Sequence, residues 1–238
     1  MTDSFLHDFW EASALNHLTV SDFGAKVLAY ETNQQDFTTD PLAGSHAAHP
    51  LPLRNDRLHK IIQSRRSARS FSDRALSEKE LGQILGAVSG DREQRMYPSA
   101  GGLGSAEVFA LLNRVDSDLG RMAARYLPNQ HALTPVSDEL PPLTDLDQLL
   151  SLEGCDPALI LVFAVRLDEV VRKYGARGGR FALIEVGHAC QNIALRLAVD
   201  GLAGYQLGGT LDHDLEQLMG LGAGRAQVTL GYAIGHPA

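Results

Sequence analysis

The chain has 238 residues, of which 44% are apolar, and a formal net charge of −8 at pH 7. This acidic balance argues against a nucleic-acid partner and against a polybasic membrane anchor, because both need a basic face, and no apolar run is long enough to span a membrane. The two cysteines, Cys155 and Cys190, form no Cys-x-x-Cys pair, and the first residues carry no export signal, so the sequence predicts a cytoplasmic protein.

Residues 1–50 are interpreted as an N-terminal arm that is partly irregular. Phe5, Leu6, Phe9, Trp10 and Leu15 could form one short amphipathic helix. A polar stretch follows, and His46 and His49 within it fit a flexible loop better than a metal site, because no carboxylate or thiol joins them at ligand spacing. Residues 51–238 contain no repeat and no clear linker, and we therefore predict one domain there.

The first half of this domain alternates helix and strand signals. A helix is expected from near Leu58, with Ile61 and Ile62 on its inner face. Ser77-x-x-Glu80 is a capping box that opens a second helix, with Gly90 as its stop. Two strands follow in the prediction, Val108–Leu112 and the continuous apolar run Ala158–Val165, and between them Leu127–Pro142 is read as an irregular, mobile lid.

The second half centres on one long apolar helix. A short helix over Asp168–Tyr174 precedes a buried helix over Phe181–Val199, which Gly201 ends. Within it, His188 is interpreted as a core histidine, with a catalytic role as the alternative, Cys190 as packing and Glu185 as a partner for a buried donor. The chain then predicts a strand over Gly204–Leu207, a helix capped by Asp212, and a final strand over Val228–Ile234.

The segment Arg65-Arg66-Ser67-Ala68-Arg69 concentrates three guanidiniums and one hydroxyl. Arginine presents a planar fork of donors that matches phosphate oxygens. The segment is therefore a candidate anion site, and a solvated basic surface is the alternative.

Two glycine-bearing segments offer their backbone to a flat ligand. Pro98-Ser99-Ala100-Gly101-Gly102 lacks large side chains, and its amides could approach a ring system, although a flexible turn is the alternative. The segment is neither a nucleotide-hydrolase phosphate loop nor a dinucleotide fingerprint. Gly208-Gly209, after the last but one strand, is a second such approach.

In this order and at these intervals, the motifs resemble the nitroreductase-like flavoprotein superfamily, and within it the SagB-type (thiazoline/oxazoline) dehydrogenases of peptide natural-product pathways. The resemblance runs from about Arg65 to Pro237 and includes two further stretches, Lys173-Tyr174-Gly175-Ala176-Arg177-Gly178 and Leu230–Pro237. It implies an α+β fold with a mostly antiparallel central sheet surrounded by helices, and a homodimer with shared FMN sites. Gly179 departs from the pattern, since SagB-type relatives often carry tyrosine there.

The resemblance also implies roles for single residues. Arg65 and Ser67 would hold the FMN phosphate, Arg69 would reach the pyrimidine edge of the flavin, and Arg66 is a further contact. The loop of Pro98, Ser99, Ala100, Gly101 and Gly102 would come from the partner subunit and lie against the isoalloxazine. A backbone amide of Gly208 or Gly209 would point at flavin N5, and the helix around Gln191 and Asn192 would lie at the dimer interface.

Lys173 and Tyr174 match a pair that azoline-oxidising relatives need for catalysis. Turning an azoline into an azole removes a hydride, which goes to flavin N5, and a ring proton, which needs a base; lysine or tyrosine serves only where its pKa is lowered. The alternative is a surface pair at a helix end.

Three functions remain open at this point. The first is FMN-dependent dehydrogenation of azoline rings in a modified peptide, and the second is an NAD(P)H-dependent nitro or quinone reductase. The third is a flavin-binding or degenerate scaffold subunit of a biosynthetic complex, with residues 1–50 docking its partner proteins. No metal is expected.

Overall fold

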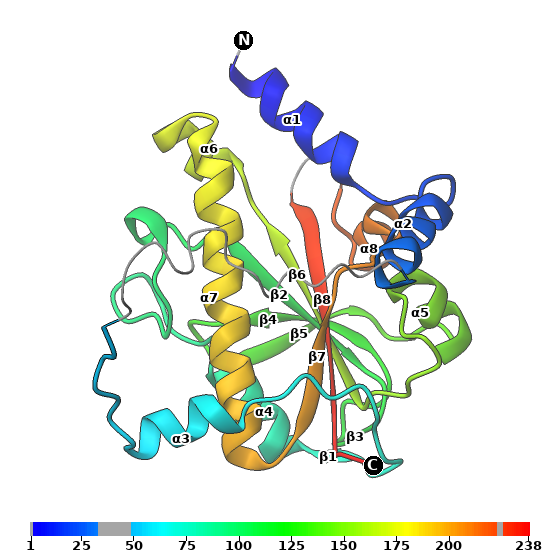
Figure 1. Ribbon diagram of the computed structural model, residues 1–238. Coiled ribbons are helices and arrows are strands. Elements are labelled where there is room, and N and C mark those ends of the chain that lie inside the picture. The colour runs from blue at the N-terminus through cyan, green and yellow to red at the C-terminus, as the bar shows by residue number, and fades with distance from the viewer. Residues whose placement is uncertain (1, 33–48, 223–225) are drawn as a thin grey trace.

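The computed structural model describes residues 2–32, 49–222 and 226–238. Its centre is a six-stranded antiparallel sheet in the order β5-β4-β2-β6-β8-β7 (Figure 1). The strands are β2 (Ala106–Leu112), β4 (Ala123–Leu127), β5 (Ala132–Ser137), β6 (Leu159–Val165), β7 (Ala203–Leu207) and β8 (Gln227–Gly235). A second, parallel pair joins β1 (Leu76–Ser77) to β3 (Val115–Asp116). The predicted α+β class with an antiparallel central sheet is confirmed.

Helices surround this sheet. They are α1 (Thr2–Ser13), α2 (Val20–Thr32), α3 (Arg57–Ser64), α4 (Glu78–Gly86), α5 (Leu143–Leu150), α6 (Asp168–Tyr174), α7 (Arg177–Asp200) and α8 (Asp212–Leu218), with a 3-10 turn, η1, at Ala100–Gly102. Figure 1 shows α7 running along the sheet, with α6 at its upper end and α3 and α4 near its lower end. None of the helices in the described part of the chain is long and apolar enough to cross a membrane.

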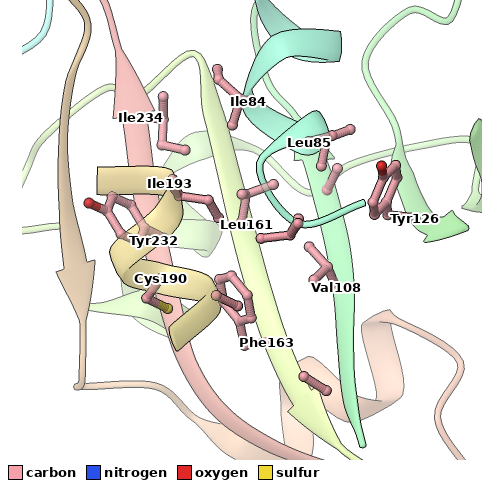
Figure 2. Packing of buried hydrophobic residues seen from close by; sticks show 14 of the residues in the cluster. Ile84, Leu85, Val108, Tyr126, Leu161, Phe163, Cys190, Ile193, Tyr232 and Ile234 are labelled. Carbon is pink, nitrogen blue, oxygen red and sulfur yellow. The ribbon is translucent and has the colours of Figure 1, made fainter. Parts of the chain in front are cut away.

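The two central strands explain why the sheet has two cores. Every residue of β2 and β6 is buried, and successive side chains of a strand point to opposite faces. Val108 and Phe163 therefore pack with Cys190 and Ile193 of α7 and with α4 (Figure 2). The alternate residues of β2 and β6, whose side chains point to the opposite face of the sheet, pack with leucines of α5 and α8. The continuous apolar runs read from the sequence are strands covered on both sides.

Several predicted helix limits are confirmed and others are corrected. The capping box at Ser77 is present, α6 has the predicted bounds, and Gly201 ends α7 in a left-handed conformation. Helix α4, however, ends at Gly86 and not at Gly90. Ile62 does not face inward, because 49% of it is exposed.

The predicted mobile lid over Leu127–Pro142 is wrong, because the segment as far as Ser137 belongs to a β-hairpin. Tyr126 pairs with Leu133 and Leu127 with Ala132. Pro135 lies in β5, which among the described strands pairs only with β4 and forms an edge of the sheet. An edge strand tolerates a residue that has no backbone N–H. The proline that suggested irregular structure is thus compatible with a strand.

The N-terminal arm contains two helices where one was predicted. Trp10 of α1 is buried against the main core, and a bridge between Leu15 and Leu211 ties the arm to the domain. Residues 33–48, which include His46 of the histidine pair, lie outside the described part. Among the residues that are described, no group of His, Cys, Asp and Glu could hold a metal ion. The division into residues 1–50 and 51–238 stays a prediction.

Candidate flavin site

The predicted glycine loop is anchored to α7 by a buried carboxylate. Glu185, 2% exposed, accepts hydrogen bonds from the hydroxyls of Ser99 and Ser105, both at 2.8 Å, and from the backbone N–H of Ala106 at 3.3 Å. Ser99 in turn accepts from the backbone N–H of Gly104. Glu185 satisfies buried donors as predicted, and these bonds fix the loop where β2 begins.

Gly101 brings this loop against the predicted Lys-Tyr pair. It adopts a left-handed conformation, with φ at 63°, that glycine accepts without strain. A Cβ at this position would contact the Nζ of Lys173 and lie 2.7 Å from the phenol oxygen of Tyr174. The loop and the pair, far apart in the sequence, therefore lie side by side within one chain.

Aromatic packing at the end of α6 orients the pair. The ring of Tyr174 packs edge-on against Phe181 of α7, with 5.1 Å between centroids, and the Nζ of Lys173 lies 5.3 Å from the Tyr174 centroid. Tyr174 is half-buried and Lys173 is exposed. The pair has a defined position, but in the single chain its amine is open to water.

Two glycines at the start of α7 allow close approach of other helices, Gly178 to α6 and Gly179 to α1. A Cβ on Gly178 would lie 2.6 Å from the carbonyl oxygen of Val170 in α6. A Cβ on Gly179 would lie 2.5 Å from Leu6 of α1. Leu6 thus occupies space at the position where the resemblance leads one to expect a tyrosine.

The arginine segment follows α3 and is pinned to the edge strand β7. The N–H of Ala68 donates to the carbonyl of Gly204, and the guanidinium of Arg69 lies 5.2 Å from the centroid of the Tyr205 ring. The Nη1 of Arg65 lies 3.4 Å from the hydroxyl of Ser67, so these two groups can meet one anion.

Arg66 behaves differently from its neighbours. Its Nη1 donates to the carbonyls of Gln63 and Arg65, at 2.5 and 2.9 Å, and so satisfies acceptors at the end of α3. Arg65 lies near Tyr232 on β8; burial raises the pKa of Tyr232 to about 12, and the positive charge of Arg65 opposes that rise.

The second glycine pair follows β7. Gly208 has open space where a Cβ would be, whereas the carbonyl of Gly209 accepts a 2.7 Å hydrogen bond from the hydroxyl of Ser151. Gly208 can therefore be approached by a ligand, and Gly209 is held in place by the loop after α5.

Within one chain the structure does not join the two halves of the predicted site. In the described residues, no hydrogen bond or ion pair connects Arg65–Arg69 with Pro98–Gly102. The arginine segment begins near the lower end of α7, and Lys173 and Tyr174 lie by its upper end (Figure 1).

Two predicted roles on the helices are corrected. His188 is not a core residue: its side chain is exposed, with Nδ1 3.3 Å from the carbonyl of Pro98. Asp212 does not cap α8, because Leu211 is the N-cap residue and Asp212 instead accepts a hydrogen bond from Thr210. Cys190 is fully buried, and burial raises the pKa of its thiol to about 12, which fits a packing role.

The structure also shows a polar cluster that the sequence reasoning missed. Glu107 is 8% exposed and forms ion pairs with Arg125 and Arg166. These residues lie on three different segments, so no local sequence motif identifies the cluster. The only sequence signal is a carboxylate inside the otherwise apolar strand Ala106–Leu112.

Comparisons with known proteins agree with this architecture. "Putative nitroreductase MJ1384" of Methanocaldococcus jannaschii is 27% identical over 172 residues, covering 68% of this chain and 84% of the relative. The microcin B17-processing protein McbC of Escherichia coli is 33% identical over 139 residues, covering 54% of this chain and 49% of McbC, so this match spans about half of McbC.

Two solved structures share the fold. A chain of the E. coli microcin synthetase McbBCD complex with truncated pro-MccB17 bound has a TM-score of 0.66 and 20% identity, with 94% of this chain and 95% of that chain covered. The NADPH:FMN oxidoreductase from Vibrio harveyi complexed with NAD+ has a TM-score of 0.51 and 19% identity, with 75% and 68% covered. The family model described as "Nitroreductase family" matches residues 62–236, and the chain therefore belongs to the nitroreductase family of oxidoreductases.

Proposed function

We propose that this protein is an FMN-dependent dehydrogenase that oxidises azoline rings to azoles in a peptide-derived natural product. The observation that carries the proposal is the contact of Gly101 with the amine of Lys173 and the phenol of Tyr174. The similarity to a microcin-processing protein, and to a complex with a bound pro-peptide, supports a peptide substrate.

The residues present fit FMN. Arg65 and Ser67 would bind its phosphate, because a guanidinium and a hydroxyl lie 3.4 Å apart on an accessible segment. Arg69 would reach the pyrimidine edge, with Arg66 as a further contact, and the open backbone at Gly208, with Gly209 beside it, would face the ring system. When bound, FMN would accept the two electrons removed from the substrate ring.

Lys173 and Tyr174 would handle the proton. The ring carbon must lose a proton as its electrons leave, and a positioned base is worth about 10²–10⁴-fold in rate. The edge-on packing of Tyr174 against Phe181 holds the pair in place. Exclusion of water, or a nearby positive charge, favours a neutral amine. In this proposal a second chain and the substrate cover Lys173, which is exposed in the single chain.

A homodimer is part of the proposal. Large apolar side chains remain exposed on α3 and α7, namely Leu58, Ile62, Leu183, Ile184 and Val199. Burying such side chains in a second copy would stabilise association. It would also bring the Pro98–Gly102 loop of one copy to the arginine segment of the other. The proposal also includes further biosynthetic partner proteins. It places the protein in a reducing cytoplasm, which keeps both cysteines free.

The test is oxidation of a synthetic thiazoline peptide by the flavin-loaded protein, followed by mass spectrometry for the loss of two hydrogen atoms. Lys173→Ala and Tyr174→Phe should each lower the rate by about 10²-fold or more. Lys79→Ala, an exposed lysine on α4, is the matched control and should leave the rate unchanged. Wild-type rates in both site variants would refute the proposed roles, and protein unable to take up flavin would point to a scaffold subunit.

The second candidate is an NAD(P)H-dependent reductase of nitro compounds or quinones. The match to "Putative nitroreductase MJ1384", which covers 84% of that relative, favours it. Rapid bleaching of the flavin by NADPH under nitrogen, with an unchanged thiazoline peptide, would establish this function over the first.

A further inference from the structure

A small pocket at the start of β2 gathers three guanidiniums. Arg95, Arg125 and Arg166 line it, together with Glu107, Gly104 and the ring of Tyr126, and its volume is about 120 Å³. Arg125 comes from β4 and Arg166 follows β6. Because β4 and β6 flank β2 in the sheet, the fold brings these side chains to one place.

The positive charge in this pocket exceeds the negative charge. Glu107, with 7% of its side chain exposed, receives both Arg125 Nη2 at 2.9 Å and Arg166 Nε at 2.6 Å on the same oxygen, Oε1. Arg95 forms no ion pair within the described residues. One carboxylate therefore faces three guanidiniums, and two of them must share it.

Other acidic groups nearby do not neutralise the excess positive charge of the pocket. Asp91 lies close enough to Arg95 to be influenced by its charge but forms no ion pair with it in the described structure. Asp168 and Glu169 line the adjoining groove beside Arg166, but within the described residues neither forms an ion pair with it. Glu169 is paired with Arg172 at 2.9 Å.

Contacts with Tyr97 and the backbone conformation of Gly104 hold Arg95 in the pocket. Its Nη1 lies 3.3 Å from the phenol of Tyr97, and its guanidinium lies 5.5 Å from the centroid of that ring. Its Nη2 occupies the place where a Cβ on Gly104 would be, and Gly104 has a left-handed φ of +66°. The Nε of Arg95 is buried and has no hydrogen-bond partner among the described residues. A buried donor of this kind calls for an acceptor.

We propose that this pocket binds one oxyanion group, a carboxylate or a phosphate. Guanidinium groups bind both through paired, charge-assisted hydrogen bonds. The pocket is well below the roughly 300–1,000 Å³ of sites for whole drug-sized ligands. It therefore fits a single anionic group of a larger molecule. The site is distinct from the Arg65–Arg69 segment and does not depend on the proposed function.

The test uses the full chain and two probes, inorganic phosphate and N-acetylglycine, in isothermal titrations at constant ionic strength with chloride as the balancing anion. One probe should saturate, and the preferred probe identifies a phosphate or a carboxylate source. Arg125→Gln and Arg166→Gln should each weaken this binding about tenfold, because one guanidinium fork is lost. Both side chains are partly exposed, at 41% and 51%, so the variants should fold, which circular dichroism checks.

Three further variants locate the binding. Arg172→Gln, at a surface arginine 76% exposed, should leave it unchanged. Arg65→Gln should remove any separate binding of inorganic phosphate at the proposed flavin phosphate site and leave the binding that depends on Arg125 and Arg166 unchanged. Glu107→Gln should tighten it several-fold, since the competing carboxylate is removed. Absence of saturation by either probe, wild-type affinity in both Arg125→Gln and Arg166→Gln, or loss confined to Arg65→Gln would each overturn the proposal.

Discussion

Gly178 is the position at which α7 touches the backbone of α6, and replacing it with alanine tests how the Lys-Tyr pair is positioned. The added Cβ would lie 2.6 Å from the carbonyl oxygen and 2.7 Å from the carbonyl carbon of Val170. Heavy atoms pack best at about 3.5–4.0 Å, so the two helices would have to separate by about 1 Å. Such overpacking costs about 1–3 kcal/mol.

Gly187 in the same helix is the matched control, because a Cβ there meets no atom within 4 Å. Alanine is favoured over glycine in a helix by up to about 1 kcal/mol, so Gly187→Ala should be neutral or stabilising. In urea denaturation followed by circular dichroism, the two variants should differ by about 1–3 kcal/mol in unfolding free energy, with unchanged m-values.

The same separation of helices should be visible in activity. Moving the end of α6 by about 1 Å displaces Lys173 and Tyr174 from Gly101, and a misplacement of that size can cost about 10²-fold in rate. Equal stability of Gly178→Ala and Gly187→Ala would refute the reasoning that backbone contact sets the spacing of α6 and α7. A concentration-dependent loss of stability in Gly187→Ala would instead show that a second chain covers this face.

Substitutions at three other positions give separate tests. Gly101→Ala combines a strained left-handed backbone with displacement of Lys173 and Tyr174, so thiazoline oxidation should fall by about 10²-fold, measured by mass spectrometry. Glu185→Ala leaves three donors without their acceptor and should cost about 3 kcal/mol or more in urea denaturation, and Glu185→Gln should cost less. Burial raises the pKa of Asp212 to about 6, so the native state holds a proton that the unfolded state releases near pH 4. Wild-type stability should therefore fall as pH rises from about 4 to 6, by at most about 3 kcal/mol, whereas the stability of Asp212→Asn should not fall in this window.

Sequence patterns predicted the helices and strands whose own residues carry a clear hydrophobic pattern. The run Leu159–Val165 is apolar throughout and is a buried strand, and the helix ending at Tyr174 has its predicted bounds. The edge strand β5 was missed because it is short, carries Pro135 and has no clean alternation of apolar and polar residues. This strand forms because it pairs with β4, and that pairing cannot be recognised from the residues of β5 alone.

The sequence motifs of the candidate site could be predicted, but their positions relative to one another in space could not. The arginine segment and the glycine loop are recognisable in the sequence, yet the contact of Gly101 with Lys173 follows from the docking of α6 against α7. The exposure of His188 was missed because the apolar residues around it, Ile184 among them, suggested burial on every side. Apolar residues on an outer helix face mark burial in the monomer or in an assembly, and sequence alone does not separate the two.

This distinction gives a physical argument for the dimer in the proposal. The arginine segment and the Lys-Tyr pair lie toward opposite ends of α7 in one chain (Figure 1). A ligand whose phosphate is bound at Arg65 would need a second copy to bring the glycine loop to its ring system. The exposed Ile62 and Ile184 supply apolar surface for that contact. If the assembly is required, Ile184→Glu should lower flavin affinity although this side chain lies outside the proposed site. A monomer that retains flavin at dilution would show that each chain builds its site alone.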